Sequence, residues 1–224
     1  MLGLGLGLNK GNRIDGGGGI LLYSSRLESF DDFTGTPSAT NDSIVAPSGV
    51  NIPLGANQVI QRQAGANSDL YIQLAGDHIE ELYTTFYLNI VDMGATSSTS
   101  RVSYLEFGAF AGADIWEINQ ALGLLPDIRI EGPFDAGPQV INTDADLNRW
   151  YKYEVYHKVT ADENILKIYV DGSLVVDNIC SPSEGPNLRS TRLSLTAING
   201  VFDMTIQIAG LTMHTGEFVD PFNT

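Results

Sequence analysis

The strongest constraint on the fold is a repeated pattern of short runs in which apolar and polar residues alternate up to a turn. Residues 165–170 alternate in this way and end at Asp171-Gly172. An Asp-Gly dipeptide suits the positive φ angles of a type I′ turn, so residues 165–170 and 174–176 are predicted to form a β-hairpin. Residues 202–213 also alternate, and we expect Ile206 and Ile208 to face the core and Thr205 and Gln207 to face outward.

Similar runs recur along the whole chain, separated by Gly, Pro, Asn and Asp, with little helical periodicity. One exception is Asp114 followed by Glu117, a spacing typical of a helix N-cap box, so a short helix is an alternative there. Residues 30–53 are rich in turn formers and are predicted to be a long surface connection. The predicted strands are Ile20–Ser24, Gln58–Arg62, Asp69–Leu74, Glu81–Val91, Arg101–Phe110, Asp127–Glu131, Tyr151–Val159, Ile165–Val170, Leu174–Val176, Arg192–Ala197 and Phe202–Met213.

Charge and cysteine content limit the partners and the compartment. The 224 residues include 27 acidic and 12 basic side chains, which give a net charge of −15. Such a field repels phosphate backbones and anionic membrane surfaces, so we expect neither nucleic acid nor a membrane as a partner. Cys180 is the only cysteine, so no intrachain disulfide can form, which fits synthesis in a reducing host cytoplasm.

The N-terminal segment differs in composition from the rest. Residues 1–19 alternate leucine with glycine at Leu2, Leu4, Leu6 and Leu8, and end in a four-glycine run that is typical of a hinge. An extended strand would place all four leucines on one face with no core to cover them. The arm is therefore predicted either to be disordered or to pair with a partner subunit, ahead of one domain over residues 20–224.

Two sequence segments resemble a known family. Residues 150–159 (WYKYEVYHKV) and 162–176 (DENILKIYVDGSLVV) resemble the signature of concanavalin-A-like lectin/glucanase and laminin-G-like jelly rolls, where a tryptophan opens a strand and an Asp-Gly hairpin follows. The resemblance implies an all-β, two-sheet antiparallel jelly-roll sandwich. It implies no single function, because this fold carries many.

The opening MLGLGLGL resembles that of bacteriophage structural proteins, in which such an arm precedes a compact β-domain displayed on the particle. This resemblance implies a virion location, other virion proteins as partners, and repeated copies or a homo-oligomer in the particle. It also accounts for a cytoplasmically made, acidic chain with an apolar arm.

Candidate catalytic and metal sites are weakly supported. Glucanases of this fold resemble one another in a Glu-x-Asp-x-Glu strand motif, which this chain lacks; Glu106, Asp114 and Glu117 are the nearest pieces. Residues 144–148 place two aspartates and an asparagine like the start of a calcium loop, but without the closing glutamate. His78, His157 and His214 lie far apart, and His157 is expected to face inward. We therefore predict no catalytic residue, no metal and no cofactor.

Aromatic side chains are the remaining candidate ligand contacts. Trp116, Trp150, Tyr151 and Tyr156 could stack on the apolar face of a sugar ring. Trp150 is expected in the core, and Trp116 is the candidate glycan contact, because it follows a Gly/Ala-rich stretch.

These observations favour a non-enzymatic bacteriophage virion structural protein, such as a capsid decoration, head fibre or tail component, anchored to other virion subunits by its N-terminal arm. The alternative is a carbohydrate-binding module for a bacterial surface glycan. A glycoside hydrolase ranks third, because the paired carboxylates are missing.

Overall fold

The computed structural model describes residues 20–31, 33, 37, 40–63, 69–73, 80–93, 100–107, 114–121, 125–131, 139–159, 162, 164–180, 190–194, 196–198 and 204–216. In these ranges the chain is all-β, with fifteen strands and no helix. The predicted arm, residues 1–19, lies outside them. The strands are β1 (Leu21–Ser25), β2 (Asp42–Val45), β3 (Val59–Gln63), β4 (Asp69–Gln73), β5 (Glu81–Asp92), β6 (Ser100–Phe107), β7 (Asp114–Ala121), β8 (Asp127–Glu131), β9 (Gln139–Asn142), β10 (Trp150–Val159), β11 (Asn164–Val170), β12 (Ser173–Cys180), β13 (Ser190–Ser194), β14 (Thr196–Ile198) and β15 (Thr205–His214).

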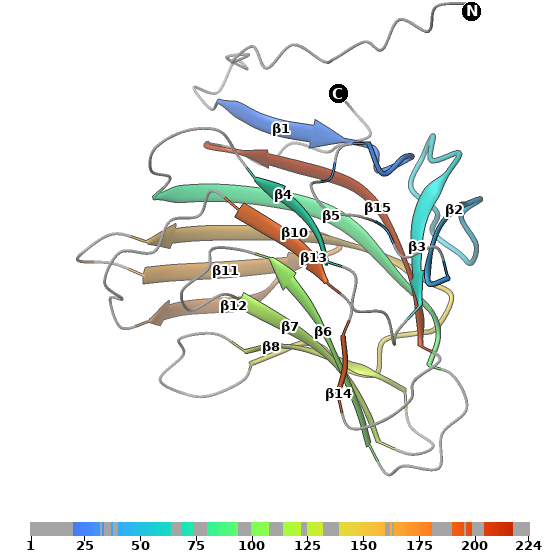
Figure 1. Cartoon of the computed structure of the whole chain (residues 1–224). Coiled ribbons are helices and arrows are strands. Elements are labelled where there is room, and N and C mark those ends of the chain that lie inside the picture. The colour runs from blue at the N-terminus through green and yellow to red at the C-terminus, as the bar shows by residue number, and fades with distance from the viewer. Residues whose placement is uncertain are drawn as a thin grey trace, which may run out of the picture.

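The strands pack as two antiparallel layers. Eight of them form what we call the large sheet, in the order β12-β11-β10-β5-β15-β3-β2, with β1 also paired to β15. The second layer contains the five-stranded sheet β14-β6-β7-β8-β9 and the pair β13-β4, and β13 lies beside β6. Figure 1 shows the second layer crossing one face of the large sheet. The predicted antiparallel two-sheet sandwich is confirmed.

The main core lies between the layers and is built by alternate residues of the central strands. Phe86 of β5, Tyr153 of β10 and Ile206 of β15 are fully buried there. The rings of Phe86 and Tyr153 stack with centroids 5.3 Å apart. Ile118 of β7 and Ile130 of β8 face them from the second layer. Burial of such side chains contributes roughly 1.5–3 kcal/mol each relative to exposure.

One turn and one bulge set the register in two of the strands. Asp171 and Gly172 have φ angles of 48° and 79°, so the predicted type I′ hairpin between β11 and β12 is confirmed. In β15, Gly210 interrupts the pairing with β5 at a positive φ of 57°, and its N–H donates to the Arg26 carbonyl over 2.9 Å. This bulge shifts the alternation by one residue, so that Leu211 and Met213 face the core beyond it.

Residues 114–121, residues 30–53 and Gln207 differ from the sequence-based predictions. Residues 114–121 form strand β7 rather than a helix, because pairing Ile118 with Ile128 of β8 buries both side chains, and this outweighs the local N-cap signal. The presumed surface connection contains β2. Gln207 faces outward as predicted but is buried rather than solvated, because the loop between β2 and β3 covers it.

Strand β2 contributes a buried ion pair that the sequence did not indicate. Asp42 lies opposite Arg62 of β3, on the core side of the sheet. The Arg62 guanidinium donates from Nε to Asp42 Oδ1 over 2.8 Å and from Nη2 to Oδ2 over 3.3 Å. The two side chains are 0% and 1% exposed. A two-point bond of this kind offsets the desolvation of both charges only while both partners are present.

We expect Asp42→Ala to lower the free energy of unfolding by about 3–5 kcal/mol, because Arg62 would remain buried without its partner. Urea unfolding measures this change. The double variant Asp42→Leu/Arg62→Met removes both charges and should recover most of the loss. A loss below about 1 kcal/mol for Asp42→Ala would contradict the buried-pair interpretation.

Burial of the Tyr153 phenol also predicts that the free energy of unfolding falls at alkaline pH. Desolvation raises the pKa of the Tyr153 phenol well above its ordinary value of about 10. The folded state therefore holds this group neutral, and its contribution to stability is present below about pH 10 and is lost as the pH rises further, because only the unfolded chain can ionise. We expect Tyr153→Phe to flatten the decline of the unfolding free energy above about pH 10, and equal slopes would contradict this.

Candidate functional site

The outer face of the large sheet, which points away from the second layer, carries polar and aromatic side chains. On β5 the residues Leu82, Phe86 and Leu88 face the core. Tyr83, Thr85 and Tyr87 alternate with them and therefore point outward; the two tyrosines are partly exposed and Thr85 is buried. Register then identifies which residues of the neighbouring strands share this face.

Three rings form a row across β15, β5 and β10, which we call the aromatic row. His214 and Tyr156 lie opposite Tyr83 in the register of their strands. The Tyr83 ring has its centroid 4.6 Å from that of Tyr156 and 5.6 Å from that of His214. Tyr83 and Tyr156 are partly exposed, while His214 is buried. Tyr83 and Tyr156 therefore present adjoining ring surface to solvent, whereas the His214 ring stacks on Tyr83 and is itself covered.

Charged side chains extend the aromatic row along the same rank. Lys167 of β11 lies opposite Tyr156, and its Nζ is 3.3 Å from Asp177 Oδ1 of β12. In the next rank, Glu154 of β10 forms an ion pair with Lys152 of the same strand, with Lys152 Nζ 2.9 Å from Glu154 Oε1. Ammonium and carboxylate groups thus flank the rings on one side.

The rank beside the aromatic row contains two buried hydroxyl groups. Thr85 and Thr212 lie opposite each other on β5 and β15, and both side chains are fully buried. Within the described part of the chain neither Oγ1 has a hydrogen-bond partner. Buried hydroxyls normally find partners, so this rank has hydrogen-bonding capacity left over. The partly exposed Tyr83 and Tyr156 rings and the charged groups beside them can stack on and hydrogen-bond to a polar cyclic ligand, whereas the buried Thr85 and Thr212 hydroxyls are not accessible to one.

The other end of the outer face is covered. Trp150, Val59 and Ala209 form a small second cluster there, separate from the main core. The Trp150 Nε1–H donates to the Ser48 carbonyl over 2.8 Å, and the Ser48 N–H donates to Gln207 Oε1 over 3.0 Å. Trp150 is therefore buried, as predicted, but beneath the loop between β2 and β3 rather than between the two layers.

The candidates named from sequence are spread over several places. Trp116 lies in β7, where its register partners are Leu105 and Ile130; its side chain lies outside the described part of the structure. Leu2, Leu4, Leu6 and Leu8 also lie outside it. Tyr156 belongs to the aromatic row, whereas sequence reasoning missed Tyr83 and His214, whose positions become adjacent only through strand register.

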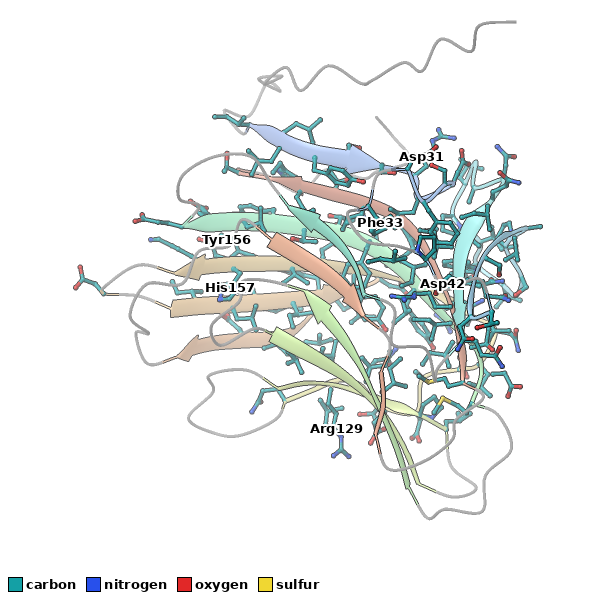
Figure 2. All side chains as sticks on the ribbon, in the orientation of Figure 1. Asp31, Phe33, Asp42, Arg129, Tyr156 and His157 are labelled. Atoms are coloured by element: carbon teal, nitrogen blue, oxygen red, sulfur yellow. The ribbon has the colours of Figure 1, made fainter. Side chains whose placement is uncertain are left out.

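The remaining aromatic and histidine candidates have structural partners. Tyr151 donates from its hydroxyl to Asp146 Oδ2 over 3.3 Å, and the Arg149 guanidinium carbon lies 4.8 Å from its ring centroid. His157 is buried on the core face with Tyr153, as predicted. Figure 2 labels Tyr156 and His157, which are consecutive in β10 and therefore belong to opposite faces.

The calcium-like segment is a hydrogen-bonded polar loop. Asp144 N–H donates to Asp127 Oδ1 over 3.2 Å, and Asn148 Nδ2 donates to the Val91 carbonyl over 3.1 Å. Asp144 and Asn148 both have positive φ angles. Among the residues described, no group of three or more His, Cys, Asp or Glu side chains could hold a metal ion. The same residues include no helix that is long and apolar enough to cross a membrane.

Comparison with known proteins identifies the fold. No protein-family profile and no curated protein matches the chain. Among solved structures, the alginate lyase Aly36B matches with a TM-score of 0.54 at 11% identity, over 82% of this chain and 86% of the lyase. Cellulose induced protein Cip1 matches with a TM-score of 0.53 at 9% identity, over 85% of this chain and 96% of Cip1.

The receptor binding domain of botulinum neurotoxin D matches with a TM-score of 0.55 at 13% identity, over 89% of this chain and 50% of that one. The chain therefore spans about half the length of the neurotoxin chain. A serotype D ligand binding domain in complex with N-acetylneuraminic acid matches at 12% identity, over 81% of this chain and 44% of that one, with a TM-score of 0.50.

The chain has a jelly-roll-like β-sandwich fold. This agrees with the resemblance to concanavalin-A-like domains at the level of fold. The prediction that the chain is not an enzyme is contradicted, because an enzyme, the alginate lyase, has this fold over most of the chain. The missing glucanase motif excluded one chemistry only, whereas the sandwich supports several.

Proposed function

We propose that this domain binds a glycan on the outer face of the large sheet, at the aromatic row. The supporting observation is the pair of adjoining, partly exposed rings of Tyr83 and Tyr156, with the buried His214 ring stacked on Tyr83. Aromatic faces pack on the apolar side of sugar rings, and the Glu154 and Lys152 side chains beside them can bond to hydroxyl groups.

The structural neighbours support the same class of ligand. One neurotoxin D ligand binding domain is in complex with N-acetylneuraminic acid, a sugar, and Aly36B is a lyase of alginate, a polysaccharide. Their low sequence identity to this chain leaves the individual sugar open. The proposal therefore rests on the aromatic row, and the neighbours supply only the class of ligand.

If glycans stack on the Tyr83 and Tyr156 rings, substitutions that remove a ring should weaken glycan binding more than substitutions that keep it. We expect Tyr83→Ala and Tyr156→Ala each to weaken glycan binding about tenfold or more, because each removes roughly 1–3 kcal/mol of stacking. Tyr83→Phe and Tyr156→Phe are matched controls that keep the rings and should lose much less. Retention on a polysaccharide and oligosaccharide array, followed by calorimetry on the glycan that binds, measures the effect.

The same array can be assayed for newly formed sugar ends, which separates binding alone from cleavage. Cleavage that is lost in Tyr83→Ala would make the aromatic row part of a catalytic site. Binding that is unaffected by both alanine variants would contradict the proposal, as would an array on which no glycan is retained.

A second proposal concerns where the domain acts. We propose that the chain is a structural component of a bacteriophage particle, anchored to other virion subunits by residues 1–19. The leucine-glycine alternation supports this, since four leucines on one face need cover from another protein. The arm leads directly into β1, which lies beside β15 in the large sheet. An arm at this position can add to a sheet of a neighbour.

Deletion of residues 1–19 tests the anchoring proposal. We expect the shortened chain to be lost from particles while circular dichroism and the melting temperature stay unchanged, because β1 and the core begin after the arm. Occupancy in purified particles, measured by quantitative mass spectrometry, is the readout. Full occupancy without the arm would rule out the anchoring role.

A further inference from the structure

The loop between β2 and β3, residues 46–58, presents three exposed apolar side chains, and we call it the apolar loop. Val50 is 59% exposed, Ile52 is 42% exposed and Leu54 is 90% exposed. They lie within five consecutive residues. The loop connects β2 and β3 at one end of the large sheet in Figure 1. A cluster of exposed apolar side chains marks an interaction site more often than a single exposed apolar residue does.

The apolar loop is held rigidly in place. Ser48 is bonded to Gln207, Asn89 and Trp150, at 3.0, 3.1 and 2.8 Å. Val50 N–H donates to the Asn148 carbonyl over 2.8 Å, and the Val50 carbonyl accepts from Trp150 N–H over 3.0 Å. A preorganised surface loses little entropy on binding, so even a small apolar area can give useful affinity.

Glycine at position 49 is required by this arrangement. Gly49 has a φ of 90°, and a side-chain Cβ there would lie 2.1 Å from the Asn148 carbonyl oxygen. At the far end of the loop, Arg26 Nη1 donates to the Gly55 carbonyl over 3.2 Å, and Glu28 Oε1 accepts from Asn57 N–H over 3.4 Å. Hydrogen bonds at both ends of the loop thus hold Ile52 and Leu54 in their exposed positions.

Charge favours one occupant for this surface. Residues 1–19 contain Lys10 and Arg13 against Asp15, a net charge of +1, which leaves −16 for residues 20–224. Two such bodies repel each other, whereas a basic leucine-rich arm is attracted to an acidic body. The arm joins the body at Ile20, and the apolar loop lies by Arg26 at the opposite end of β1.

We propose that the apolar loop is the docking site for the leucine-glycine arm of a second copy of this chain. This inference rests on the proposed anchoring role of the arm and names its neighbour. Each copy offers one arm and one loop, so the contact is heterologous and joins copies head to tail. Leu54 and Ile52 supply apolar surface on which the leucines of the arm can pack.

A complementation experiment with full-length chains tests this proposal. The loop variant carries Ile52→Asn and Leu54→Asn, and the arm variant carries Leu4→Ser and Leu6→Ser. Light scattering after size-exclusion chromatography gives the mass at rising protein concentration. We expect the natural chain to form species larger than a dimer and each variant alone to stay monomeric. An equimolar mixture of the variants should form dimers only, since one copy supplies the arm and the other supplies the loop.

The matched control carries Leu125→Asn and Val140→Asn, two apolar residues elsewhere that are 41% and 44% exposed, and it should assemble like the natural chain. Circular dichroism confirms that every variant is folded. A natural chain that stays monomeric at all concentrations overturns the proposal, as does a mixture of variants that forms no dimer. Assembly that the arm variant loses and the loop variant keeps overturns this docking site but leaves the anchoring role standing.

Discussion

Ser48 organises the part of the structure from which both proposed surfaces derive. Its N–H and hydroxyl donate to Gln207 Oε1, and its carbonyl accepts from Asn89 and Trp150. These bonds hold residues 46–58 over one end of the large sheet, where the loop buries Trp150 on the outer face. At the other end, which the loop does not cover, the Tyr83 and Tyr156 rings are partly exposed.

Local pattern predicted one hairpin and the side of one long strand that faces the core. The β11–β12 hairpin and the core side of β15 follow from alternation and from the turn chemistry of Asp171-Gly172. Strand β7 could not be predicted, because Asp114 and Glu117 give a genuine N-cap signal and only the pairing of Ile118 with Ile128 overrides it. Local propensity is a weak prior where tertiary pairing decides the structure.

The candidate surfaces were less predictable than the fold, since they depend on register between distant segments. Tyr156 was recognised as an aromatic candidate, but nothing in the sequence joins it to Tyr83 and His214. Alternation predicted correctly that Gln207 points outward. It could not show that Ser48 would cover this side chain, because the outer face of a sheet is polar whether water or a hydrogen-bonded loop lies above it.

The positions of the two surfaces have a consequence for binding strength. Leu21, the first residue of β1, pairs with His214 of the aromatic row, so the arm leaves the body beside the proposed glycan site. The apolar loop lies near the other end of β1, by Arg26. Copies joined from arm to loop would therefore bring several aromatic rows into one assembly. Repeated weak sites on one scaffold gain avidity for a repeating polymer, and a single sheet face of stacked tyrosines then suffices for firm attachment.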